Sequence, residues 1–136
     1  MSPSRVRRGF TLMELVIVLA VLALLAAMAW PSYMSSLRQS RRVDAMDAVV
    51  RAQQAQERWR ATQASYSSVL ADLGLAAVSP AGYYALALSA ASETAYTLTA
   101  TAVSGRSQAA DTGCAVLTVV VTRGNAVFGQ PACWGR

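Results

Sequence analysis

The chain begins with a short basic leader that runs directly into a long apolar segment, and this segment constrains the fold more than any other feature. The leader ends at Gly9, and residues 10–30 are apolar apart from Thr11 and the single carboxylate of Glu14. A helix of this length spans roughly the 30 Å hydrocarbon layer of a bilayer, at about 1.5 Å per residue. An ionised carboxylate in that layer costs about 2.5–3.5 kcal/mol, so Glu14 indicates a function that involves a partner.

Two kinds of cleaved export signal share parts of this pattern. A secretory signal would be cut after the small residues 27–29, and a twin-arginine signal would use Arg7 and Arg8 shortly before Phe10. Glu14 argues against the first, and the twin-arginine motif is too short to be specific. In both alternatives the apolar segment is discarded, whereas a segment that is kept explains more of the chain.

The composition argues against an enzyme. The chain has no histidine, which excludes Ser-His and Cys-His nucleophile pairs and histidine metal sites. We find no P-loop, dinucleotide or zinc-site pattern and expect no cofactor. The formal charge of +5 comes from arginine, and three of these arginines lie in the leader, so the charge is weak support for nucleic-acid binding. Cys114 and Cys133 lack the spacing of a redox pair, and an exported domain would join them.

The segment after Pro31 changes from apolar to amphipathic. We expect one helix over residues 10–62, in which Pro31 removes a backbone hydrogen bond and kinks the helix without ending it. Small and apolar residues recur at three- and four-residue spacing, which predicts one face that packs on a core. Its predicted members are Ala45, Val49, Ala52, Ala55 and Trp59, widened by Val43, Met46 and Val50. Asp47 and Arg51 are placed to form an ion pair on an exposed face.

Short runs of alternating residues predict a small sheet in the last third of the chain. In the second run, Tyr96 and Leu98 fall on one face and Thr97 and Thr99 on the other. The predicted strands are 83–89, 95–103, 115–122 and 125–128, the last two joined by a turn at residues 123–125. The fold class is therefore α+β: a long N-terminal α-helix, hydrophobic in its first half and amphipathic in its second, packed on an antiparallel sheet.

The arrangement of these motifs resembles that of type IV pilin precursors. The resemblance rests on Gly9 to Glu14, on Pro31 to Tyr33, on Gln56 to Trp59 and on the C-terminal cysteine pair, and the tail is most similar to the small PilE-like minor pilins. It implies four parts: a leader (1–9), a transmembrane and assembly helix (10–30), the amphipathic half of that helix (31–62), and a loop, sheet and disulfide-closed region (63–136).

The resemblance also implies roles for single residues. A prepilin peptidase would cut between Gly9 and Phe10, the new Phe10 amine would be methylated, and Glu14 would pair with that amine on a neighbouring subunit. The partners implied are the peptidase, other pilin subunits in a homo- or heteropolymer, and the pilus assembly machinery of the inner membrane. Before assembly the chain would cross the inner membrane once, with its N-terminus in the cytoplasm. Afterwards it would form part of a retractable surface fibre for adhesion, twitching motility or DNA uptake.

Two other functions stay open at this point. A pseudopilin of a type II secretion system would share the N-terminal signal, although the cysteine pair is more typical of pilins. A pilus-borne DNA receptor would need a basic surface on the folded part. Arg38, Arg41 and Arg42 are candidates, but arginines directly after an apolar segment are more typical of contacts with anionic lipid headgroups or subunit carboxylates. Trp59 and Trp134 are expected to pack rather than to stack on bases.

Overall fold

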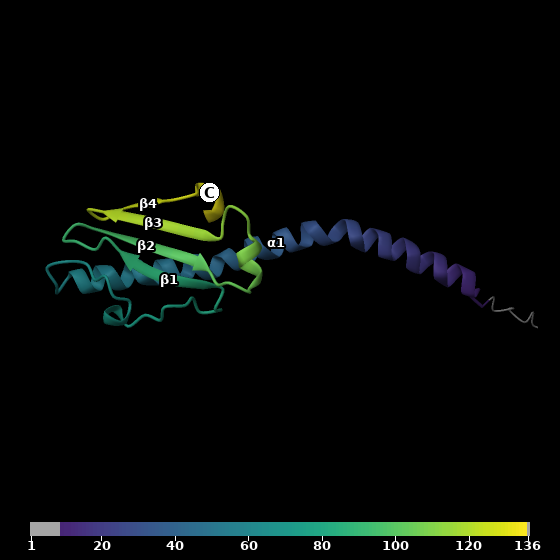
Figure 1. The fold of residues 1–136 in the computed structure, drawn as a ribbon, viewed down its shortest axis with the longest axis horizontal. Helices are drawn as coiled ribbons and strands as arrows, with labels where there is room; N and C mark the ends of the chain where they lie inside the picture. Colours follow the sequence, from purple (N-terminus) through teal and green to yellow (C-terminus); the bar gives the residue numbers. More distant parts are fainter. Residues whose placement is uncertain (1–8, 136) are drawn as a thin grey trace, which may run out of the picture. The chain divides into compact units, whose positions relative to one another are not determined.

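The computed structural model describes residues 9–135, so the leader before Gly9 lies outside the described residues. The chain falls into two compact units, Met1–Ser35 and Ser36–Arg136, and we call the second the head. One helix, α1 (Leu12–Arg60), belongs to both units (Figure 1). The other elements are η1 (Ala71–Leu73), β1 (Tyr84–Ser89), β2 (Ala95–Ala102), η2 (Ser107–Ala110), β3 (Val116–Thr122), β4 (Asn125–Phe128) and η3 (Pro131–Trp134).

The predicted long helix is confirmed. It begins directly after Thr11 and is followed by a turn in which the amide of Gln63 donates to the carbonyl of Trp59 at 3.0 Å. Pro31 lies inside α1 and does not end it. The loss of one backbone hydrogen bond at a proline is tolerated within a helix of 49 residues. The kink at Pro31 stays a prediction.

The head contains an antiparallel meander with strand order β1-β2-β3-β4 (Figure 1). The four strands match the predicted ranges to within a residue at each end. Thr122 pairs with Asn125, which leaves Arg123 and Gly124 as a two-residue turn. Both have positive φ, 51° and 77°, as a type I′ hairpin requires. The α+β fold expected from the sequence is thus confirmed.

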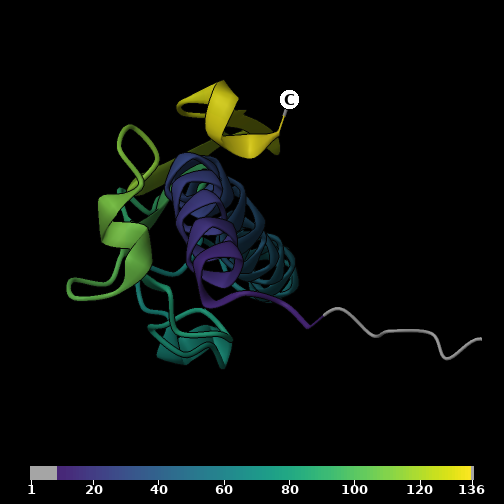
Figure 2. The same cartoon turned by 90° about the vertical axis from the view of Figure 1, so that its right-hand side faces the viewer.

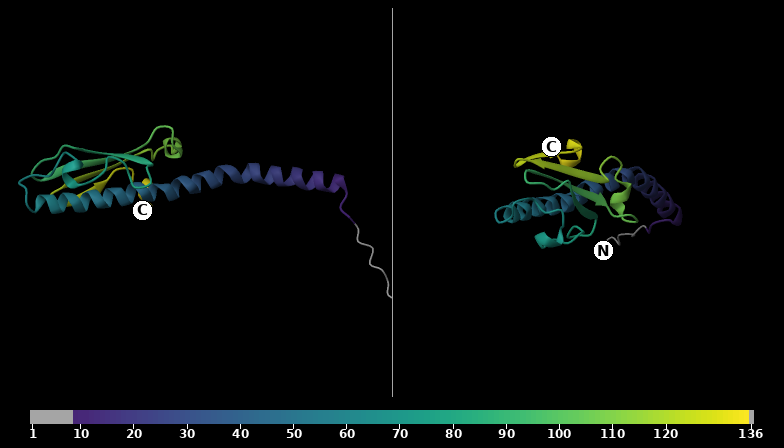
Figure 3. Two further views of the ribbon diagram at one scale, coloured as in Figure 1. Left: turned by 90° about the horizontal axis from the view of Figure 1, so that it is seen from below. Right: turned by 60° about the vertical axis from the view of Figure 1, so that its left-hand side comes forward.

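The core lies between one face of the sheet and one face of α1, which form two layers in the head (Figure 3, left). The strands contribute large side chains, and the helix contributes small ones that let its backbone approach the sheet closely. From the strands the fully buried residues include Tyr84, Tyr96, Leu98, Leu117 and Val119, and from α1 they are joined by Ala45, Ala48, Val49 and Ala52.

The predicted helix face was wrong at two positions. Val43 and Val50 are exposed, at 60% and 48% of their surface. At 3.6 residues per turn they lie about 140–160° around the helix from Ala45, on the side away from the sheet. Ala48 and Gln56 take their places in the buried face. The two valines were placed on the buried face because they are hydrophobic. The helical period instead places the small Ala48 and the polar Gln56 on that face.

The buried Gln56 connects the helix to the loop between α1 and β1. Its side-chain amide donates to the carbonyl of Ser67 at 2.7 Å and accepts from the amide of Ser67 at 2.9 Å. The NH2 group and the carbonyl oxygen of this side chain are therefore each hydrogen-bonded, which offsets the cost of its burial. Seen along the helix, this loop and the C-terminal segment lie on opposite sides of α1 (Figure 2).

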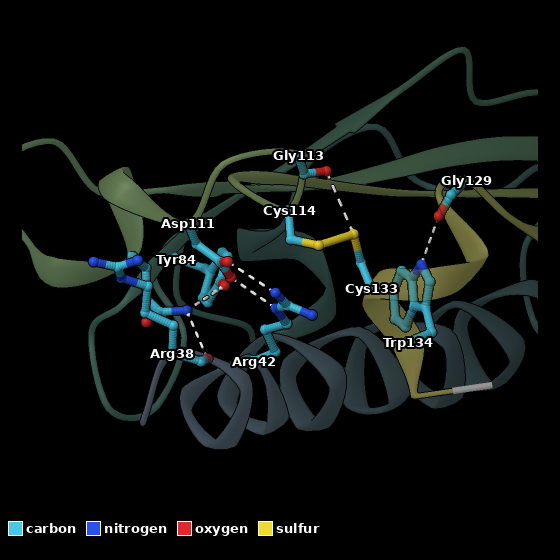
Figure 4. Close-up of a disulfide and its surroundings, with 10 residues drawn as sticks. Arg38, Arg42, Tyr84, Asp111, Gly113, Cys114, Gly129, Cys133 and Trp134 are labelled. Carbon is cyan, nitrogen blue, oxygen red and sulfur yellow. Dashed lines mark hydrogen bonds and ion pairs between the residues drawn. A yellow bond between two sulfur atoms is a disulfide. The ribbon is translucent and has the colours of Figure 1, made fainter. Parts of the chain in front are cut away.

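A disulfide closes the C-terminal part of the head. It joins Cys114, just before β3, to Cys133 in η3 (Figure 4). The indole of Trp134 donates to the carbonyl of Gly129 at 2.6 Å and meets the ring of Phe128 edge to face. A closed loop of this size removes unfolded-state entropy worth about 3 kcal/mol. That is a large share of the roughly 5–15 kcal/mol that stabilises a small domain.

Candidate functional site

The first turn of α1 is built from residues next to the expected cleavage point. The hydroxyl of Thr11 accepts a hydrogen bond from the amide of Glu14 at 3.2 Å, so Thr11 caps the helix. Glu14 is the third helical residue and completes the Thr-x-x-Glu pattern of a capping box. Its negative charge also suits the positive end of the helix dipole. Gly9, Phe10, Thr11 and Glu14 together line an open pocket of about 450 Å³.

The apolar part of α1 presents its side chains outward in the first unit. Leu12 is 84% exposed and Val18, the most covered of the large side chains in this run, is still 49% exposed. Among the described helices, α1 is the one long and apolar enough to cross a membrane, with a mean hydropathy of 2.7 over its best window. Covering such side chains is worth about 1.5–3 kcal/mol each. An apolar environment around this segment would therefore be strongly favourable.

A loop of the head is fastened to α1 by two polar contacts. Arg42 donates to both carboxylate oxygens of Asp111, at 2.7 and 2.8 Å (Figure 4). This bond to Asp111 raises the pKa of Arg42 above its ordinary value. The buried amide of Gln108 donates to the carbonyl of Arg38 at 3.1 Å and to the hydroxyl of Tyr84 at 2.8 Å. The segment around η2 is therefore held firmly against the helix.

Beside these contacts, arginines gather around one tyrosine. The guanidinium of Arg41 lies 5.0 Å from the ring centroid of Tyr83, and that of Arg106 lies 5.8 Å from it. Both distances are in the range of cation–π contacts. Arg41 also donates to the hydroxyl of Ser107. We call Arg41, Tyr83 and Arg106 the Tyr83 cluster.

Asp44 positions the turn that carries Tyr83. Its carboxylate accepts hydrogen bonds from the hydroxyl of Ser79, from the amide of Ala81 at 2.8 Å and from the amide of Tyr83 at 3.3 Å. Asp47, by contrast, forms the predicted ion pair with Arg51 at 2.8 Å. Asp44 and Asp47 are three residues apart in the sequence, and their carboxylates bind different partners.

A second polar region lies near the C-terminal end of α1. An open groove of about 540 Å³ runs between the last turns of α1 and the β3–β4 hairpin. Its helix side presents two amide groups, the carboxylate of Glu57 and one guanidinium, and its hairpin side includes Gly124, next to the exposed Arg123. The lining residues are Gln53, Gln54, Glu57, Arg58, Tyr96, Val121, Gly124 and Ala126. We call this the Gln53 groove.

The predicted site residues fall into three places. Gly9, Phe10 and Glu14 come together around the first turn of α1, Pro31 lies within the helix, and Cys114 and Cys133 are bonded to one another. Sequence reasoning missed both the Tyr83 cluster and the Gln53 groove. Within the described part of the chain, no group of three or more histidine, cysteine, aspartate or glutamate residues could hold a metal ion.

Two family models match the chain. Residues 4–30 match the prokaryotic N-terminal methylation motif, which covers the leader, the first turn of α1 and its apolar segment. Residues 31–118 match the family described as "Type IV minor pilin ComP, DNA uptake sequence receptor". Among curated proteins, none matches the chain. The second match covers more than half of the sequence and favours a pilin over the pseudopilin alternative. Together with the long helix and the four-stranded sheet, it shows that this chain belongs to the ComP family of type IV minor pilins.

Proposed function

We propose that the chain is made as a precursor, that a prepilin peptidase cuts it between Gly9 and Phe10, and that the new Phe10 amine is methylated. The match of residues 4–30 to the methylation motif supports this. Gly9 has no structural task of its own, since a Cβ built there would meet no atom within 4 Å. Because the fold does not require a glycine here, a role in recognition by the peptidase would explain why Gly9 is small.

We further propose that the precursor crosses the inner membrane once, with its N-terminus in the cytoplasm, and that the mature subunit lies in the surface pilus. Charge does not orient the segment, because three arginines precede it and Arg38, Arg41 and Arg42 follow it. The Cys114–Cys133 disulfide supports this topology, since such bonds form on the oxidising side of the membrane.

In the fibre, we propose that Glu14 pairs with the Phe10 amine of a neighbouring subunit. The neighbours are other pilin subunits, in a homo- or heteropolymer, and the inner-membrane assembly machinery delivers them. The exposed position of Glu14 beside Phe10, in the first turn of α1, supports a contact with another chain. A buried pair of this kind fixes the register between helices. We propose a structural role for the chain and no catalytic one.

We propose that the head of this minor pilin binds DNA, and that the Gln53 groove is the binding site. The observation that carries this proposal is the match of residues 31–118 to a DNA uptake sequence receptor family. The geometry of the groove supports it. Arg58 on the helix and Arg123 on the hairpin tip are exposed, form no salt bridge within residues 9–135, and can contact phosphates. Gln53 and Gln54 carry the amide groups that pair with adenine in base readout.

The backbone at Arg123 adds a second argument for this site. Arg123 has a φ of 51°, a left-handed conformation in which asparagine, aspartate or glycine is the usual residue of a type I′ turn. Its amide donates to the carbonyl of Thr94 at 2.7 Å, which fixes the hairpin tip against the β1–β2 turn. An arginine held in a conformation that costs energy is typical of a functional position.

Replacing both Arg58 and Arg123 with glutamine is expected to weaken DNA binding by the isolated head, residues 36–136, by roughly tenfold or more at physiological salt. Each lost phosphate contact also lowers the slope of log K against log salt by about one. Fluorescence anisotropy with genomic duplex fragments and with random duplexes, over a series of salt concentrations, measures both quantities.

The matched control is Arg51→Gln. It removes one charge from the same helix as Arg58, half of what the double variant removes, but Arg51 is paired with Asp47 and lies outside the Gln53 groove. It should leave both the affinity and the salt slope near the values of the unaltered head. If the control and the double variant behave alike, the groove is the wrong site. If the unaltered head has no salt-dependent affinity for either kind of duplex, the proposal of DNA binding fails.

A further inference from the structure

The Tyr83 cluster is a concentration of positive charge that DNA binding at the Gln53 groove leaves unused. Within residues 9–135 the salt bridges are Arg42–Asp111 and Arg51–Asp47, so Arg38, Arg41 and Arg106 have no carboxylate partner there. The nearest carboxylate along the helix, that of Asp44, is occupied by Ser79, Ala81 and Tyr83. The guanidinium groups of Arg41 and Arg106 thus lie beside one tyrosine ring without a carboxylate counter-ion among the described residues.

The arginines are held in place by groups that leave much of their hydrogen-bonding capacity unused. Tyr83 positions Arg41 and Arg106 through its ring, and an aromatic face takes up none of the five N–H donors of a guanidinium. A Cβ added at Gly82 would lie 3.5 Å from the guanidinium of Arg106, so that arginine lies close over the turn. The Nε of Arg38 is buried and, among the described residues, has no hydrogen-bond partner.

Two like charges beside one ring repel each other, and an anion between them would turn this repulsion into attraction. Guanidinium groups bind phosphate particularly well because their planar donors match two oxygens at once. The contacts of Gln108 and Asp111 with α1 hold the segment that carries Arg106 in a fixed position. The cluster is therefore a preorganised site for a phosphate group.

The position of the cluster in the chain indicates which phosphates it meets. Arg38 and Arg41 follow Trp30 within about three turns of the same helix. Trp30 and Tyr33 form a ring pair 6.3 Å apart at the end of the apolar segment, as aromatic residues do at a membrane surface. Basic residues close after a membrane segment bind anionic phospholipids.

We propose that the Tyr83 cluster binds the phosphate groups of anionic phospholipids at the bilayer surface before the subunit enters the fibre. The sequence pointed to Arg38, Arg41 and Arg42 for such a contact. The structure changes the set, because Arg42 is neutralised by Asp111 while Tyr83 and Arg106 join from distant parts of the chain. The lipid contact would hold the head against the membrane on the face that carries η2.

Hydrogen–deuterium exchange of the full chain in lipid nanodiscs tests this proposal. In discs that contain phosphatidylglycerol, the amides of residues 104–107 should exchange at least fivefold more slowly than in discs of phosphatidylcholine alone. Each arginine near an anionic surface contributes about a fivefold effect. The Arg41→Gln, Arg106→Gln double variant should lose this difference. The Arg58→Gln, Arg123→Gln variant, which removes the same charge elsewhere, should keep it.

Further arms of the experiment separate the alternatives. If the double variant loses protection in β2 and β3, and is thus unfolded, the single variant of the exposed Arg106 decides instead. Equal exchange in the two kinds of disc overturns the proposal. So does protection of residues 104–107 in neutral discs by millimolar inorganic phosphate, by duplex DNA or by added copies of the head, since each assigns the cluster to a different anion.

Discussion

Replacing Gly9 with leucine is expected to leave the chain as an unprocessed precursor in the membrane and to remove it from the pilus. The substitution should not disturb the fold, because a Cβ at this position would meet no atom within 4 Å. A bulky side chain would, however, not fit an enzyme pocket that accepts only a small residue before Phe10. Intact-mass spectrometry of the membrane fraction measures the result as the mass of the nine leader residues retained.

The control for this prediction is Gly9→Ala, which adds one methyl group. The alanine variant should be cleaved at a measurable rate. Failure of the leucine variant would then reflect the size of its side chain and not merely the loss of the glycine. A leucine variant that yields a normal mature chain beginning at methylated Phe10 would contradict the assignment of Gly9 and Phe10 as the cleavage site.

Replacing Glu14 with leucine is expected to abolish incorporation into fibres while leaving membrane insertion intact or improved. The substitution removes a carboxylate that costs about 2.5–3.5 kcal/mol inside a bilayer. It also removes the proposed partner of the Phe10 amine on the next subunit. Immunoblots of sheared fibres and of the membrane fraction separate the two effects, since the defect should be confined to the fibres.

The capping geometry supplies a sharper comparison. Thr11 accepts a hydrogen bond from the amide of Glu14, and glutamine serves in the same position of a capping box as well as glutamate. Glu14→Gln therefore keeps the local helix start but loses the charge. We expect the Glu14→Gln subunit not to enter fibres, which would show that assembly requires the negative charge of Glu14. Assembly at the unaltered level would mean that Glu14 only begins the helix.

Local pattern was enough to predict most of the fold. The apolar run and the small residues at helical spacing gave α1, and alternating residues such as Tyr96 and Leu98 gave the strands. The turn at Arg123 and Gly124 followed from its position between two such runs. These features depend on residues that are close together in the sequence, so they can be predicted from the local sequence pattern. Val43 and Val50 were misplaced because their hydrophobicity was given more weight than the helical period.

The polar sites of the head could not be predicted in the same way. The Tyr83 cluster brings Arg41 on α1 together with Arg106 in the loop before β3, and their contact depends on how that loop folds back onto the helix. Asp44 lies on α1, yet its hydrogen-bond partners lie in a turn that is distant in the sequence. Buried glutamines such as Gln108 look like surface residues until the fold is known. The N-terminal site could be proposed from the sequence because Gly9, Phe10 and Glu14 are close together in the chain, and their roles stay predictions.

Quantitative mass spectrometry of purified, sheared fibres decides whether this chain is a processed minor subunit of a type IV pilus. We expect a subunit that begins at N-methylated Phe10, carries the Cys114–Cys133 disulfide and is present at a small fraction of the major pilin. A chain that is abundant in the cell envelope but absent from the fibres, or one that begins after residue 29, would contradict it.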